Sequence, residues 1–229
     1  MPEPQLPVIS PPGPIYRIGR RPDPWVPIDW AYAGDDLTFG NRFDDSEGYF
    51  RVLYAASKPL GCFIETLARY RSAPTVDLIA ALQEIENAEP DYIAPGTVPA
   101  SWLAKRMIGV ATAGKNKRYA DIYSSAGLAY LRKTFGRGSL AKRMKSKQDF
   151  DLALLMSQDR TLTQQISTHI YQLGYDGIYY PSRHGHDLFN WALFEPFDLQ
   201  FVSAREVNTD NLDLTTALEH LALRLDASL

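Results

Sequence analysis

The stretch Phe50-Arg51-Val52-Leu53-Tyr54-Ala55 alternates apolar with other residues and is rich in β-forming side chains, which predicts a strand. A helix is expected directly after it. Ser57 should cap this helix, and Pro59 lies in its first turn, where a missing N–H costs little. The apolar positions have the three-and-four spacing of an amphipathic helix and are Leu60, Phe63, Ile64, Leu67 and Ala68. Residues 50–68 therefore predict a strand followed at once by a helix.

Three polar residues stand out around this strand and helix. Glu65 lies toward the edge of the apolar stripe, where a carboxylate can reach a cleft wall while its neighbours fill the core. Arg42 follows a run of turn-forming residues, and Ser182 stands where an apolar run breaks into a polar loop. A cation, an anion and a hydroxyl in these settings could hold a phosphorylated ligand that contains ribose.

Each of the three also has a purely structural interpretation. Glu65 could do no more than complement the dipole of its helix. Arg42 could form a surface ion pair with Asp44 or Asp45, and Ser182 could be an ordinary turn residue. The sequence leaves these alternatives open.

The rest of the chain alternates irregularly between strands and helices. Strands are predicted at 15–18, 102–112, 178–180, 191–194 and 198–204, and helices at 76–87, 124–134, 148–157, 160–173 and 212–225. The helix at 160–173 is the best marked, because Gly174 follows it as a stop. This order favours an α+β fold of mixed, mostly antiparallel sheets flanked by helices over a doubly wound parallel sheet.

Length and composition fit one globular domain. The chain has 229 residues, 45% hydrophobic and 22% charged, and no low-complexity linker divides it. We expect a proline-rich arm at 1–14 and a single domain at 15–229 with a helical, basic insertion near 113–160. The net charge of −3 argues against direct nucleic-acid binding. The basic residues of the insertion form either a solvated face or a surface for phosphates or an acidic partner. They are Lys115, Lys117, Arg118, Arg132, Lys133, Arg137, Lys142, Arg143, Lys145 and Lys147.

Several kinds of site are missing or weakly supported. The sequence has no Gly-rich phosphate loop, no GxGxxG and no Gly-x-Ser-x-Gly elbow, which argues against Walker-type, Rossmann and α/β-hydrolase chemistry. His184 and His186 alternate on a polar loop without an evident third ligand, so we expect no metal. The lone Cys62 fits a reducing compartment and a structural role. With no membrane span and no secretion signal in the sequence, we expect a cytoplasmic protein.

The chain also resembles the RES-domain family, named for its Arg, Glu and Ser, over residues 15–204. The matching fragments are Tyr16-Arg17, Gly40-Asn41-Arg42-Phe43, Val52-Leu53-Tyr54-Ala55-Ala56-Ser57, Glu65, Arg160, Leu162-Thr163-Gln164, Gly174-Tyr175-Asp176-Gly177-Ile178, Tyr180-Pro181-Ser182-Arg183 and Asn190-Trp191-Ala192-Leu193-Phe194-Glu195. Each fragment alone is weak, but their order and spacing together are fairly specific. The family motif corresponds to Arg42, Tyr54, Glu65 and Ser182, which are the expected catalytic residues.

The resemblance implies a fold similar to ADP-ribosyltransferase toxins and an enzyme that destroys NAD, by hydrolysis or by phosphorolysis with inorganic phosphate. RES proteins are typically toxins whose partner is an Xre-like antitoxin that binds DNA and blocks the active site. NAD is then the substrate, and no cofactor is required. Whether the protein forms a homodimer is left open by the sequence. Two other functions are also left open, namely ADP-ribosyl transfer to a macromolecule and non-enzymatic nucleotide binding.

Side-chain chemistry suggests a role for each candidate. Glu65 would stabilise the cation that forms as nicotinamide leaves ribose, and Arg42 would bind the pyrophosphate with its planar fork. Tyr54 would stack on nicotinamide, unless it is only a core residue of its strand. Ser182 would donate to a phosphate or to the carboxamide. Lower-ranked candidates for contacts to NAD are Arg17, Tyr49, Arg183 and Asn190.

Overall fold

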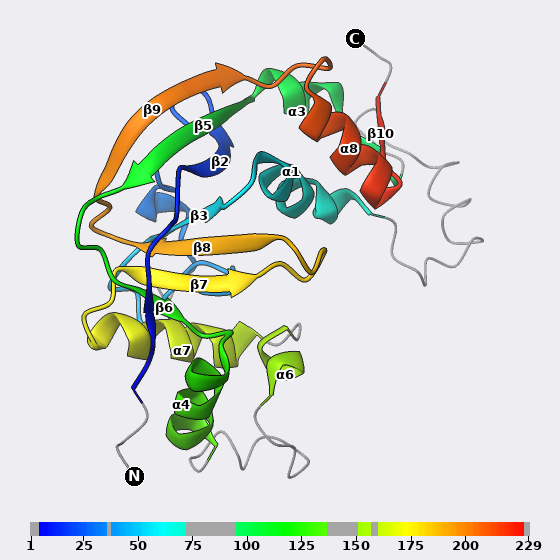
Figure 1. Ribbon diagram of the computed structural model, residues 1–229. Coiled ribbons are helices and arrows are strands. Elements are labelled where there is room, and N and C mark those ends of the chain that lie inside the picture. The colour runs from blue at the N-terminus through cyan, green and yellow to red at the C-terminus, as the bar shows by residue number, and fades with distance from the viewer. Residues whose placement is uncertain (1–4, 36–37, 72–94, 137–150, 157–159, 227–229) are drawn as a thin grey trace.

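The computed structural model describes residues 5–35, 38–71, 95–136, 151–156 and 160–226. In this part of the chain, eight strands form one curled sheet in the order β1-β6-β7-β8-β3-β2-β5-β9 (Figure 1). Neighbouring strands are antiparallel except for the parallel pair β6 and β7. The strands are β1 (Val8–Ile9), β2 (Ile15–Arg20), β3 (Val52–Ala56), β5 (Arg106–Ala113), β6 (Tyr119–Asp121), β7 (Gly177–Pro181), β8 (Phe189–Phe194) and β9 (Leu199–Glu206). A separate parallel pair joins β4 (Thr97–Val98) to β10 (Arg224–Leu225).

Helices flank the sheet in two groups, which confirms the predicted α+β class. One group lies beside β6 and β7 and contains α4 (Ser125–Phe135), α6 (Leu152–Met156) and α7 (Arg160–Gln172). The other lies at the opposite end of the molecule in Figure 1 and contains α1 (Pro59–Leu67), α3 (Ala100–Ala104) and α8 (Leu212–Leu221). Two 3₁₀ turns complete the described elements, η1 (Trp30–Tyr32) and η2 (Ala68–Tyr70). No helix in the described ranges is long and apolar enough to cross a membrane.

Three buried clusters hold these layers together. The first joins Ile166 and Ile170 of α7 to Ile178 of β7. The second joins Phe63 and Leu67 of α1 to side chains of α3, α8 and β5. The third contains residues of β2, β3, β5, β6 and β8. Because the apolar stripe of α1 is buried, the rotation of this helix about its axis is set by packing.

Several predicted elements are present with nearly the expected bounds. The predicted helix at 160–173 is α7, and Gly174 follows it with a φ of +75°, a conformation that favours glycine at a helix end. The predicted helix at 124–134 is α4, where the Ser124 side chain accepts a hydrogen bond from the N–H of Gly127 at 3.2 Å. The strands predicted at 15–18, 178–180, 191–194 and 198–204 are also present.

Other predictions were wrong in their details. Ser57 does not cap α1, because its hydroxyl accepts a hydrogen bond from Trp191 at 2.8 Å and Lys58 takes the N-cap position. The predicted strand at 102–112 begins only at Arg106, since Trp102 lies in the short helix α3 and is buried there. The C-terminal helix ends at Leu221, before a residue in the left-handed conformation and strand β10. The predicted helix at 76–87 lies outside the described residues, as does part of that at 148–157.

The proline-rich arm contributes a strand to the sheet. Val8 and Ile9 pair with β6, Leu6 is buried, and the hydroxyl of Tyr175 donates to the carbonyl of Leu6 at 2.6 Å. In the basic insertion, Lys117 pairs with an aspartate at 2.8 Å. Within the insertion, residues 137–150 and 157–159 lie outside the described ranges.

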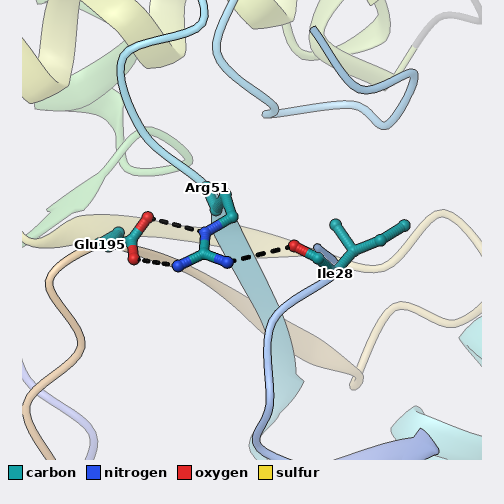
Figure 2. A network of polar contacts seen from close by, with 3 residues as sticks. All are labelled: Ile28, Arg51 and Glu195. Carbon is teal, nitrogen blue, oxygen red and sulfur yellow. Dashed lines mark hydrogen bonds and ion pairs between the residues drawn. The ribbon is translucent and has the colours of Figure 1, made fainter. Parts of the chain in front are cut away.

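An arginine network fastens the adjacent ends of β3 and β8. Arg51, just before β3, donates through Nε to Glu195 at 2.9 Å and makes a second bond to the same carboxylate, just after β8 (Figure 2). Its third contact reaches the carbonyl of Ile28 at 3.4 Å, and its guanidinium lies 5.7 Å from the ring centroid of Trp30. This fork ties the loop at 22–30 to the strand that carries Tyr54.

Candidate functional site

A cavity of about 780 Å³ opens where β2, β3, α1 and the loop after β7 meet. Its volume is in the range of sites for small molecules and cofactors. Glu65 is the one carboxylate among the described residues that line it. The positively charged residues in the lining are five arginines: Arg17, Arg42, Arg69, Arg160 and Arg183. The cavity therefore carries an excess of positive charge and suits an anionic ligand.

Glu65 is oriented by two buried donors from distant parts of the chain. Ser182 donates to Oε1 of Glu65 at 2.6 Å, and the side-chain amide of Asn190 donates to the same oxygen at 2.8 Å. Ser182 in turn accepts a hydrogen bond from the backbone N–H of His184 at 3.0 Å. No described residue bonds to Oε2 of Glu65. One carboxylate oxygen is thus fixed by the protein, and the Glu65 side chain is exposed.

Ser182 occupies a different position from the one expected. It is 4% exposed and does not line the cavity, whereas the expectation was a direct bond to a phosphate or carboxamide. The structure brings it to Glu65, because the turn after β7 aims its hydroxyl at α1. Asn190 is 2% exposed and does line the cavity, and its side-chain carbonyl oxygen is buried without a partner in the described structure.

Arg42 lines the cavity without a carboxylate partner. Its guanidinium donates to the carbonyl of Leu155 in α6. Burial lowers the pKa of Arg42, and the nearby charge of Arg183 lowers it further, but an arginine so shifted stays cationic at neutral pH. The surface ion pair with Asp44 or Asp45 that the sequence left open is not formed.

Asp44 instead belongs to the network around Tyr54. Its carboxylate accepts the Tyr54 hydroxyl at 2.8 Å, and it also accepts the backbone and side-chain N–H groups of Asn41 at 2.7 and 2.8 Å. The Tyr54 hydroxyl accepts the N–H of Phe43 at 2.9 Å. Burial raises the pKa of Tyr54 well above its ordinary value, so the phenol stays protonated. Tyr54 lines the cavity while its hydroxyl holds the loop that bears Arg42.

Arg17 is a second cation fixed by carbonyl groups. Nε donates to Pro24 at 2.8 Å, and Nη1 donates to the carbonyl of Tyr54 at 2.7 Å. Burial lowers the pKa of Arg17 to about 10, so it remains charged at neutral pH. A partly buried cation without a carboxylate partner carries a desolvation cost, and an anionic ligand in the cavity would offset that cost.

One candidate does not join the others. Tyr49 is 66% exposed and does not line the cavity, because it sits in a surface turn where its N–H bonds to the carboxylate of Asp45. Arg183 does line the cavity. Of the two loop histidines, His184 lines the cavity and His186 is exposed. The described residues contain no group of three or more His, Cys, Asp or Glu that could hold a metal ion.

Several residues that line the cavity were not among the expected site residues, and the ones with the most chemical potential are Arg69, Arg160, Tyr180 and His184. Arg69 could have been found, because it follows Glu65 by one helical turn and such residues share a face. Arg160 and Tyr180 lie in fragments that carried the family resemblance. His184 adjoins the loop serine and arginine already considered.

Comparison with known proteins identifies the family and the fold of the chain. The family model described as "RES domain" matches residues 14–217. The chain belongs to the RES-domain family. A search of the curated proteins found no match. Among solved structures, this RES chain is similar to one in the crystal structure of the M. tuberculosis MbcT–MbcA toxin–antitoxin complex. The two share 14% identity over 94% of this chain and 92% of the other, with a TM-score of 0.53, which shows a common fold.

Proposed function

We propose that this RES protein cleaves the bond between nicotinamide and ribose in NAD, by hydrolysis or by phosphorolysis. The observation that carries the proposal is a single carboxylate, clamped by Ser182 and Asn190, in the wall of a cavity whose other charged groups are arginines. NAD combines the two features that such a wall complements, a diphosphate and a sugar carbon that becomes cationic.

Glu65 would act on that sugar carbon. The C–N bond breaks with its electron pair going to the ring nitrogen, so that nicotinamide leaves as a neutral molecule. Positive charge grows on the anomeric carbon and the ring oxygen, and a fixed carboxylate stabilises it more in the transition state than in the ground state. Because Oε1 is already held by two donors, little reorientation is needed during the reaction.

The arginines would bind the diphosphate. Arg42 and Arg17 are held in the free protein by backbone carbonyls, which leave their charge unneutralised. A planar guanidinium can donate two parallel bonds to phosphate oxygens. Water or phosphate then forms the new bond to the anomeric carbon. Water loses its proton to solvent or to Glu65, and phosphate gives a sugar 1-phosphate.

The test is release of free nicotinamide from NAD, measured in phosphate-free and in phosphate-containing buffer. We expect Glu65→Gln to lose about 100- to 1000-fold in turnover, while the surface control Glu219→Gln keeps wild-type activity. A Glu65→Gln protein that folds and keeps full turnover would show that Glu65 is not the catalytic carboxylate. Transfer of label from NAD to a macromolecule, with little free ADP-ribose, would favour the ADP-ribosyltransferase alternative.

We also propose that this RES protein is the toxin of a toxin–antitoxin pair and that an Xre-like antitoxin is its partner. The proposal is supported by its family and by its shared fold with a chain of a toxin–antitoxin complex. Induced expression should stop growth and lower cellular NAD, and Glu65→Gln should not. Co-expression of an adjacent helix-turn-helix protein should restore growth. Normal growth and NAD levels on expression of the active enzyme would contradict the toxin role.

A further inference from the structure

One face of α7 carries polar side chains, next to the apolar face by which Leu162, Ile166 and Ile170 enter the core. Gln164, Ser167 and Thr168 follow one another at three- and four-residue steps, so their side chains share a face. Ser167 is 0% and Thr168 5% exposed. Hydroxyl groups buried in a helix interior require partners. Here each of the three side chains has a partner outside the helix, in the segment 39–46, and Thr168 also contacts the carbonyl of Gln164 within α7 at 3.2 Å.

The hydrogen bonds from this face bracket Arg42. Ser167 donates to the carbonyl of Phe43 at 2.6 Å, and Gln164 donates to the carbonyl of Asn41 at 3.0 Å. The backbone is therefore held on both sides of the arginine, at the residue before it and the residue after it. Gln164 also reaches the carbonyl of Phe39 at 3.3 Å.

Further contacts extend the same attachment. Thr168 donates to Oδ1 of Asp45 at 2.6 Å and accepts the N–H of Ser46 at 3.3 Å. Neither Gln164 nor Ser167 lines the cavity, so neither can touch a ligand there. Whatever they contribute to ligand binding must pass through the backbone that carries Arg42.

We propose that Gln164 and Ser167 are positioning residues, which set the place of Arg42 in the cavity and thereby the affinity for a diphosphate. The proposal rests on the proposed function for the nature of the ligand. A displacement of about 1 Å at a binding group can cost as much as 100-fold. An anchored backbone removes the main-chain freedom that the Arg42 loop would otherwise lose on binding.

The test compares two buried hydroxyls of the same helix. Ser167→Ala removes the bond to the loop. The matched control Thr163→Val removes a hydroxyl that is also 0% exposed but donates at 3.0 Å to the carbonyl of Arg160 within α7. ADP-ribose binding is measured by calorimetry, and NAD turnover supplies KM and kcat. Ser167→Ala should weaken ADP-ribose binding about tenfold and raise KM, with kcat nearly unchanged. Thr163→Val should bind as wild type does.

A second variant guards against a misfolded Ser167→Ala protein. Gln164→Met keeps the length of a partly exposed side chain, loses the amide donor, and should weaken ADP-ribose binding in the same direction. Equal affinities in Ser167→Ala, Gln164→Met and Thr163→Val would overturn the positioning role. If the wild type binds ADP-ribose but releases no nicotinamide, the proposed function fails, and the affinities still decide the role of α7. A wild type that releases nicotinamide but binds no ADP-ribose overturns the role of α7 in diphosphate affinity and leaves the proposed function standing.

Discussion

At the scale of single residues, the site depends on the hydrogen-bond partners of its charged groups. Glu65 is exposed, yet two buried donors fix one of its oxygens. Arg42 and Arg17 have carbonyl partners instead of carboxylates, so their charge remains available. If these arginines paired with surface carboxylates instead, the ion pairs would contribute little to stability.

The serine of the family motif is expected to act through Glu65. In Ser182→Ala, Oε1 keeps only one donor, and a hydrogen bond to a charged group contributes about 1.5–3 kcal/mol. The value of kcat for NAD should therefore fall about 10- to 100-fold, with KM little changed. Steady-state kinetics beside the control Ser124→Ala, which alters only a helix cap, would check this. A higher KM with intact kcat would instead indicate direct contact with the ligand.

The cysteine should be inert despite lining the cavity. Burial raises the pKa of Cys62 to about 12, and its Sγ lies 2.9 Å from the carbonyl of Tyr16. Only the thiolate reacts with alkylating agents, and at pH 8 roughly one molecule in ten thousand would carry it. Iodoacetamide should leave the native protein unmodified and label the denatured protein once, as read by mass spectrometry. Rapid labelling of the native state would refute this environment.

At the scale of elements, strands and helices bring distant segments to one place. β7 and β8 deliver Ser182 and Asn190 to a glutamate on α1, while α7 holds the Arg42 loop from the other side. The cavity lies between the two helix groups of Figure 1, since its lining residues come from α1 on one side and from α6 and α7 on the other.

The junction of β3 and β8 offers a test at this scale. Arg51→Lys keeps the charge but loses the two-pronged contact to Glu195, whose side chain is 31% exposed. We expect the free energy of unfolding to fall by about 1–2 kcal/mol, measured by urea denaturation. The exposed pair of Lys58 and Asp187 is the control, and Lys58→Met should change stability by less than about 0.5 kcal/mol. Equal losses in the two variants would show that the fork has no special role.

At the scale of the whole molecule, two buried clusters join the two helix groups to one curled sheet, and a third lies among the strands of that sheet. The RES match covers residues 14–217, so nearly all of these layers belong to one family unit. Strand β1 closes the edge of the sheet at β6. The free energy of unfolding should therefore depend on all of these buried clusters together.

Acid should destabilise the fold through histidines. Burial lowers the pKa of both His169 and His184, although Glu65 opposes the shift at His184. A lowered pKa means that the unfolded chain binds protons more readily, so this contribution to stability is present above about pH 6.5 and is lost as the pH falls. Thermal unfolding between pH 7.5 and 5.5 should show the decline, and His169→Gln should reduce its slope. An unchanged slope would mean that His169 does not contribute.

Much of the local structure and the residue types of the site follow from sequence. The spacing of apolar residues in 60–68 and 160–173, with Gly174 as a stop, predicts α1 and α7. Arg42 and Glu65 were recognisable by their settings, and Tyr54 through the family resemblance. These signals are local, because capping, turn geometry and amphipathic spacing act over one or two turns of chain.

Only the tertiary structure decided which of these groups meet. Ser182 and Glu65 are 117 residues apart and share a hydrogen bond. Asp44 lies two residues from Arg42 and yet bonds to Tyr54. Ser167 reaches across 124 residues to the carbonyl of Phe43. No local propensity encodes such pairs, because they depend on how the curled sheet and its two helix groups pack, and that packing is a property of all the buried side chains at once.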